Sequence, residues 1–153
     1  MDRVIEAVIA KNLSRSAAET LALGSAFGKQ LPPNSVVFFH GDLGAGKTTF
    51  IKGVVAGAAG VAESEVTSPT FAYLNIYRGA KTVYHFDLYR LRDADEFLAM
   101  GFDEVFDAGG ICCIEWAEKI ASLDIPQAIH VTLTHVEDGV RRIEIVNFKE
   151  SDG

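Results

Sequence analysis

The chain has 153 residues, of which 48% are hydrophobic and 23% charged, and this composition excludes a disordered or multi-domain protein. We therefore expect a single domain over residues 1–153. The 14 Lys and Arg residues against 21 Asp and Glu give a net charge of −7, which argues against a broad basic surface for nucleic acid or anionic lipid. The charged start of the chain indicates no export signal, and no apolar run approaches the roughly 20 residues that span a bilayer. The only two cysteines, Cys112 and Cys113, are adjacent in the sequence, which fits a reducing cytosol. We therefore expect a soluble cytoplasmic protein without membrane contact.

The first half of the chain alternates helix and strand signals. Ser16–Glu19 has capping-box spacing, and the helical pattern that follows stops at Pro32, so we expect a helix from Ala17. Val36–Phe39 is short and wholly apolar, as in a strand covered on both faces. Thr48 to about Ala59 predicts a second helix, which must be held by packing because Gly53 and Gly57 weaken it.

The second half adds two hairpins around another buried strand. Two β-rich segments predict the first hairpin, Asp93–Met100 a short helix, Ile111–Ile114 a buried strand and Ala117–Leu123 a further helix. The hairpin segments are Phe71–Tyr77 with Lys81–Phe86, and Ile129–Thr134 with Arg141–Phe148. The order predicts an α/β fold with three α/β/α layers and a mixed, mostly parallel sheet.

A glycine-rich loop joins the first buried strand to the second helix. The segment from Gly41 to Thr48 matches G-x-x-x-x-G-K-[ST], the phosphate-binding loop, in the strand–loop–helix context that the motif requires. We therefore expect a P-loop NTPase-like fold that binds ATP and Mg²⁺. Lys47 would reach the β- and γ-phosphates and assist catalysis, Thr48 would take one position on Mg²⁺, and Thr49 could contact the α-phosphate. The loop residues whose backbone would cradle the phosphates are Leu43, Gly44, Ala45 and Gly46.

Two acids end strands beside this loop. Glu115 follows the apolar strand Ile111–Ile114 and is the preferred Mg²⁺ ligand, whereas Asp87 would orient or deprotonate the attacking water or hold a metal-bound water. The polar segment Thr67–Thr70 is either a switch over the γ-phosphate or an ordinary loop. Trp116 either packs near the nucleotide or is structural.

His40 and His85 have no metal-ligand spacing and are interpreted as ordinary sheet positions.

Four segments in this order resemble the TsaE (YjeE) family of bacterial ATPases in tRNA threonylcarbamoyladenosine biosynthesis. They are residues 41–49, Thr67-Ser-Pro-Thr-Phe71, His85-Phe-Asp-Leu-Tyr-Arg90 and Ile114-Glu-Trp116. The resemblance implies an ATPase that binds TsaB–TsaD and supports repeated transfer of threonylcarbamoyl to adenosine 37 of tRNAs reading codons that begin with A. TsaD carries out the transfer, and tRNA contact is indirect, through the complex.

The same resemblance implies roles for individual residues. Thr48 and Glu115 would hold Mg²⁺, Asp87 would be the catalytic base, and the loop with Thr70 would be the switch. Nucleotide contacts carried over from the family are Glu118, Arg141, Arg142 and, at the base, Thr20.

Other readings of the motif remain open. A GTPase is disfavoured because no Asn-Lys-x-Asp occurs in the chain, and Asp107–Gly110 matches D-x-x-G away from a clean strand. A small P-loop kinase could use the arginine-bearing segment after Asp87 as a lid. A nucleotide-gated binding module would use ATP to order a docking surface, with incidental hydrolysis.

Overall fold

The computed structural model describes residues 8–41, 46–69 and 73–146, and the two apolar runs pair in parallel at the centre of its sheet. Its described strands are β1 (Val8–Ser14), β2 (Ser35–Gly41), β3 (Leu74–Arg78), β4 (Thr82–Asp87), β5 (Ile111–Glu115), β6 (Ile129–Glu137) and β7 (Val140–Val146). Its described helices are α1 (Ala17–Gln30), α2 (Lys47–Ala59) and α3 (Ala94–Ala99), with the 3-10 helices η1 (Glu63–Glu65), η2 (Phe102–Asp107) and η3 (Ala117–Ile120).

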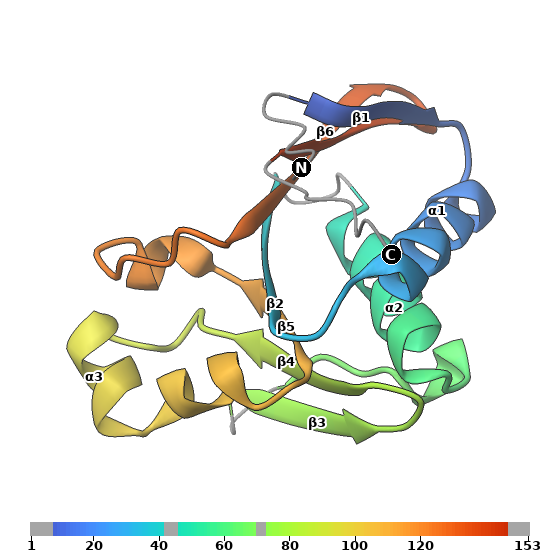
Figure 1. The fold of residues 1–153 in the computed structure, drawn as a ribbon. Coiled ribbons are helices and arrows are strands. Elements are labelled where there is room, and N and C mark those ends of the chain that lie inside the picture. Colours follow the sequence, from blue (N-terminus) through green and yellow to red (C-terminus); the bar gives the residue numbers. More distant parts are fainter. Residues whose placement is uncertain (1–7, 42–45, 70–72, 147–153) are drawn as a thin grey trace, which may run out of the picture.

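The described strands form one seven-stranded sheet in the order β1-β7-β6-β2-β5-β4-β3 (Figure 1). β2 pairs in parallel with β5 and β6, and β4 pairs in parallel with β5. β3 and β7 run against their neighbours, which makes the sheet mixed and mostly parallel, as predicted. Both predicted hairpins are present: β3 with β4, and β6 with β7.

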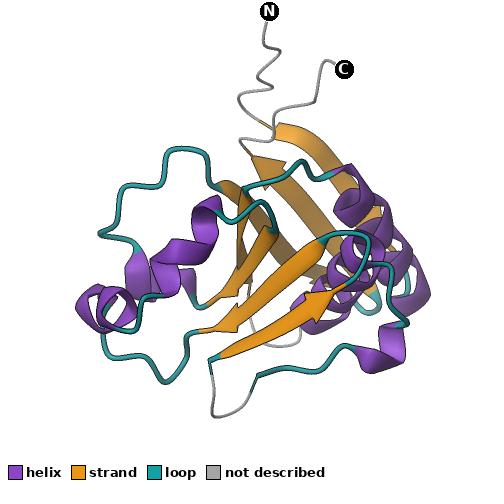
Figure 2. Cartoon of the chain, turned by 60° about the horizontal axis from the view of Figure 1, so that its bottom comes forward, coloured by secondary structure: helices purple, strands orange, loops and turns teal. Residues whose placement is uncertain are grey.

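Helices cover both faces of the sheet, which confirms the three-layer prediction (Figure 2). On one face α1 and α2 pack over a core in which the rings of Phe27 and Phe39 each lie about 6 Å from that of Phe50. On the other face α3, η2 and η3 enclose a second core around Phe86 and Phe97. Burial of both faces explains why β2 and β5 are apolar throughout.

Local signals set the limits of the helices as expected. Ser16 caps α1, accepting a hydrogen bond from the backbone N–H of Glu19 at 3.0 Å. Asp93 caps α3 in the same way through the N–H of Glu96. In the predicted second helix, Gly53 lies against the backbone of α1, so tertiary packing holds this glycine-containing helix.

The structure corrects the sequence prediction at two places. β1 is a strand where the sequence predicted none, because its pairing with β7 defines it rather than an alternating apolar pattern. The helix predicted over Ala117–Leu123 is only one 3-10 turn, η3. That turn begins at Trp116, whose φ of 60° is left-handed, and a single turn already buries Ala117 and Ile120.

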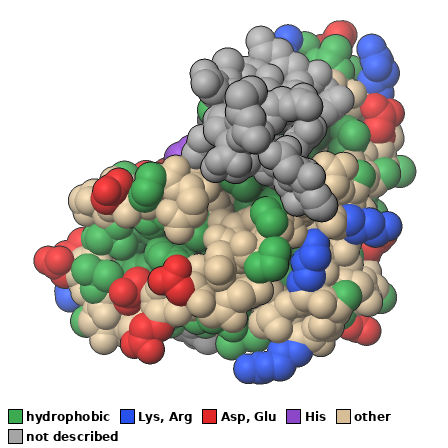
Figure 3. Space-filling model, in the orientation of Figure 1, with side chains coloured by type: hydrophobic (Ala, Val, Ile, Leu, Met, Phe, Trp, Pro, Cys, Tyr) green, Lys and Arg blue, Asp and Glu red, His purple; other side chains and the backbone are tan. Residues whose placement is uncertain are grey.

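Surface charge is uneven on the face seen in Figure 3. Acidic side chains gather on the α3 side of the molecule, and basic side chains lie mainly on the opposite side. Among the described residues, no helix has the length and apolar character needed to cross a membrane.

Candidate functional site

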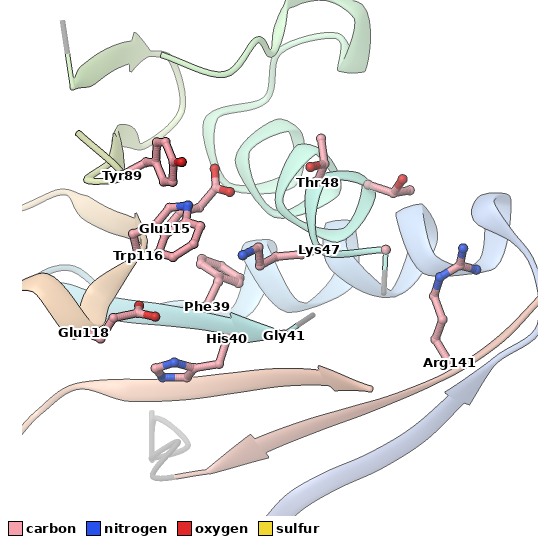
Figure 4. Close-up of a pocket in the computed structure, with 12 residues that line it drawn as sticks. Phe39, His40, Gly41, Lys47, Thr48, Tyr89, Glu115, Trp116, Glu118 and Arg141 are labelled. Carbon is pink, nitrogen blue, oxygen red and sulfur yellow. The ribbon is translucent and has the colours of Figure 1, made fainter. Parts of the chain in front are cut away.

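A cavity of about 930 Å³ lies where β2 and β5 end and α2 begins. Ligands of open α/β sheets gather at this edge, beyond the carboxyl ends of parallel strands. Its walls come from segments far apart in the sequence, as Figure 4 shows. The lining residues are Phe39, His40, Gly41, Gly46, Lys47, Thr48, Thr49, Tyr89, Glu115, Trp116, Glu118 and Arg141.

Most of the predicted nucleotide-binding residues that the structure describes meet in this cavity. The predicted residues among its lining are Gly46, Lys47, Thr48, Thr49, Glu115, Glu118 and Arg141. The predicted residues Leu43, Gly44, Ala45 and Thr70 lie outside the described residues.

The N-terminus of α2 is open to an anion. Gly46 is its N-cap, with a left-handed φ of 88° and no side-chain hydrogen bond to the first turn. The free N–H groups and the positive end of the helix dipole therefore point at the cavity. A side chain at position 46 would be strained by this φ and would also collide with Arg141.

The ammonium of Lys47 lies against an aromatic ring. Its Nζ is 5.5 Å from the centre of the Trp116 ring, which in turn packs on Tyr89 at 4.9 Å between ring centres. Figure 4 shows Lys47 extended toward Trp116 and Glu115, with Arg141 at the other end of the cavity. Among the described residues no ion pair includes Lys47.

Asp87 and Glu115 are neighbours across the β4–β5 pair. Glu115 is buried, and Nε2 of the buried His85 lies 2.8 Å from its Oε2. The Asp87 carboxylate accepts the N–H of Tyr89, and burial together with the negative charge of Glu115 raises its pKa. Asp87 does not line the main cavity. Its predicted catalytic role therefore depends on its position beside Glu115 rather than on direct exposure to that cavity.

A second cavity of about 260 Å³ lies between Glu115 and the predicted switch segment. Its lining includes Thr48, Glu115 and His85 together with Thr67 and Ser68. The backbone of Thr67 is fixed by Tyr77, whose hydroxyl accepts from its N–H and donates to its carbonyl. A hydroxyl and a carboxylate oxygen at one cavity are ligands that suit Mg²⁺, so Thr48 and Glu115 fit the predicted metal pair.

The structure places three residues suggested by the family resemblance in different positions relative to the main cavity. Arg141 lines the main cavity, and its buried Nε has no hydrogen-bond partner among the described residues. Arg142 is not a lining residue, because neighbouring residues of β7 point to opposite faces of the sheet. Thr20 is fully buried and its hydroxyl is bonded to Ser14 and to the Ser16 carbonyl, which contradicts contact with a base.

His40 and His85 lie in strands of the sheet, as predicted, and each also contacts a neighbouring side chain. His85 contacts Glu115, a contact that depends on the pairing of β4 with β5. His40 lines the main cavity, and its Nε2 lies 3.0 Å from Nδ1 of His130. Burial lowers the pKa of both His40 and His130.

The architecture defines the class of protein. A central strand and a helix that opens with lysine, joined by a glycine-rich segment in a three-layer α/β/α fold, make a P-loop NTPase-like α/β protein. The chain belongs to the TsaE family, since the family model described as "Threonylcarbamoyl adenosine biosynthesis protein TsaE" matches residues 14–143.

Similar proteins agree in sequence and in structure. A protein of Treponema pallidum described as tRNA threonylcarbamoyladenosine biosynthesis protein TsaE is 42% identical over 134 residues, covering 87% of this chain and 97% of its own. A Bacillus subtilis protein of the same description is 37% identical over 126 residues, covering 82% and 77%. The crystal structure of Bacillus subtilis YdiB is similar at a TM-score of 0.72 and 30% identity, covering 97% of this chain and 88% of that one.

Proposed function

We propose that this protein is a Mg²⁺-dependent ATPase that works with the TsaB–TsaD complex to form threonylcarbamoyladenosine at position 37 of tRNAs reading codons that begin with A. The observation that carries the proposal is the convergence of the open α2 N-terminus, Lys47, Thr48 and Glu115 on one site in a chain of the TsaE family. ATP and Mg²⁺ are the cofactors of this proposal.

The residues divide the work of binding and hydrolysis. The N–H groups at the start of α2 bind phosphate oxygens, and Lys47 neutralises charge that develops on the transferred phosphoryl group. The Thr48 hydroxyl and the Glu115 carboxylate hold Mg²⁺, which neutralises the phosphates when bound. Asp87 orients the attacking water and accepts its proton, a role supported by the direction of its pKa shift, because a raised pKa makes a carboxylate a better base.

Indirect action on tRNA is consistent with the charge of the chain. A net charge of −7, with acidic side chains gathered on the α3 side in Figure 3, gives little attraction to a polyanion. In the proposal TsaB–TsaD therefore holds the tRNA, and TsaD transfers the threonylcarbamoyl group. This protein binds to that complex in the cytoplasm.

The test is threonylcarbamoyl transfer over many turnovers with purified TsaB–TsaD and tRNA, with and without this protein and ATP. We expect repeated turnover only when both are present, and loss of that turnover in Lys47→Ala. If transfer is unaffected while the protein still hydrolyses ATP, the proposed partnership is wrong. Small-molecule phosphate acceptors would then test the kinase alternative.

One observation favours a second candidate, a nucleotide-gated docking module. Tyr89 and Trp116 are exposed by 58% and 36% and pack together at the cavity beside Lys47, so a bound nucleotide would act directly on this aromatic surface. ATP-dependent binding to TsaB–TsaD that survives Asp87→Asn, with transfer intact, would support the gate. Loss of transfer with binding retained would support the ATPase.

A further inference from the structure

His85 is almost completely buried between the sheet and α2, and its two ring nitrogens are in different situations. The residue is 2% exposed, and Nε2 makes the 2.8 Å hydrogen bond to Oε2 of Glu115. In the tautomer whose Nε2 donates the hydrogen of this bond to Glu115, Nδ1 of the neutral ring is left as an acceptor. Nδ1 is buried as well, yet it has no hydrogen-bond partner among the residues that the structure describes. A buried nitrogen without a partner is costly and calls for a functional explanation.

The surroundings of His85 indicate what its partner would be. His85 lines the 260 Å³ cavity together with Thr48, Glu115, Thr67 and Ser68. Hydrogen bonds of the Thr67 backbone to Tyr77 and Asn75 hold the start of this loop against β3. The exposed Ser68 carries a hydroxyl donor at the same cavity.

We propose that His85 is a positioning residue that connects Glu115 to the Thr67–Ser68 loop. Nε2 fixes the Glu115 carboxylate in the orientation that serves the metal site, and Nδ1 accepts a hydrogen bond from the Ser68 hydroxyl when nucleotide and Mg²⁺ are bound. Partners of this kind orient a metal-binding carboxylate and typically account for roughly 10- to 100-fold in metal affinity. The inference rests on the proposed function, because it requires a nucleotide and Mg²⁺ at this site.

The experiment measures the affinity of ADP by calorimetry with Mg²⁺ and with EDTA, and takes the ratio as the effect of the metal. In His85→Leu we expect the ratio to fall about 10-fold or more, with the EDTA affinity unchanged. His85→Gln, whose amide can place a donor near Nε2, should restore part of the ratio, and His85→Asn, which is too short to reach Glu115, should not. The exposed His135→Gln is the matched control and should behave as the unmodified protein.

Ser68→Ala tests the loop side of the connection. Hydrogen exchange of the Thr67 and Ser68 amides should slow when ADP and Mg²⁺ bind to the unmodified protein, and both Ser68→Ala and His85→Leu should lose that protection. Unchanged protection in both variants would overturn the connection to the loop.

The results separate the two proposals. If the unmodified protein binds no nucleotide, the proposed function fails. If it binds with a clear Mg²⁺ effect and His85→Leu keeps the same ratio, the positioning role fails while the proposed function stands. Should His85→Leu not fold in a thermal melt, the comparison of His85→Gln with His85→Asn decides, and equal ratios in those two variants would contradict the proposal.

Discussion

Asp87 lies half-buried beside a second carboxylate, and this position disfavours the ionised form of its carboxyl group. Burial first, and Glu115 next, raise the Asp87 pKa above its usual range, so the folded protein holds the Asp87 proton more tightly than the unfolded chain does. Ionisation of Asp87 therefore lowers the free energy of unfolding as the pH rises through the folded pKa of this side chain. Below the pKa of an unfolded aspartate, about 4, Asp87 is protonated in both states and this loss is absent.

Replacing Asp87 by Asn should accordingly raise the melting temperature at pH 7 and lose this gain as the pH falls below about 4. The variant keeps an oxygen for the Tyr89 N–H, so the charge is the main change. The gain is expected to be small because water reaches half of the side chain. Melting curves from pH 3 to 8 check it, with the exposed Asp138→Asn as control, and a gain that is independent of pH would contradict the explanation.

The two cysteines should be chemically silent in the folded protein. Both lie in the central strand β5, and burial raises the pKa of Cys112 to about 12 and that of Cys113 further. We expect no reaction with a thiol reagent such as DTNB at pH 8 in the native state and two thiols per chain in guanidinium. Prompt labelling of the native protein would mean that β5 is open to solvent.

At the level of residues, the sequence predicted which side chains meet at the cavity where these positions are adjacent in the chain or end a strand. Lys47 and Thr48 follow from one continuous motif, and Glu115 from its place at the end of an apolar strand. The hydrogen bond of His85 and the approach of Arg141 to Gly46 depend on pairing between distant segments. Those contacts could not be read from spacing alone.

The packing of α1 against α2 depends on two glycines in each helix, spaced four residues apart. A Cβ at Gly24 or Gly28 would strike the backbone of α2, and one at Gly53 or Gly57 would strike the backbone of α1. The two helices therefore approach more closely than side chains would allow. This contact fixes α2, and with it the N-terminus that opens on the cavity.

Gly53→Ala should destabilise the fold by about 1–3 kcal/mol, although alanine favours a helix by up to about 1 kcal/mol, because the added methyl group meets the carbonyl of Leu21. Urea unfolding measures the change. The exposed Gln30→Ala in α1 should stay within about 0.5 kcal/mol of the unmodified protein. A stabilised Gly53→Ala would show that the helices do not touch here.

Elements with a strong local signal were predicted, and those defined by their partners were not. The capped helix α1 and the apolar strands β2 and β5 follow from their own sequences. β1 is a strand because it pairs with β7, and η3 is a single 3-10 turn that follows the left-handed Trp116. Neither the pairing of β1 with β7 nor the left-handed conformation of Trp116 can be read from the sequence of the segment itself.

At the scale of the whole molecule, ligand binding should stabilise the fold, because the proposed site joins α2 to β5 and β7. A ligand at 100 times its Kd contributes about 2.7 kcal/mol, and each kcal/mol raises the melting temperature of a domain of this size by roughly 2–4 °C. We expect ADP with Mg²⁺ to raise the melting temperature by about 5–10 °C, and by about half of that or less in Lys47→Ala. Equal shifts in both proteins would place the nucleotide elsewhere.

The central claim is that this chain binds nucleotide phosphates at the start of α2 through Lys47. The most direct measurement is a calorimetric titration of a non-hydrolysable ATP analogue with Mg²⁺ into the unmodified protein and into Lys47→Ala. We predict one site per chain, weakened roughly 10- to 100-fold in the variant, as loss of a charged hydrogen bond requires. Binding of equal strength in both proteins, or none in the unmodified protein, would contradict the claim.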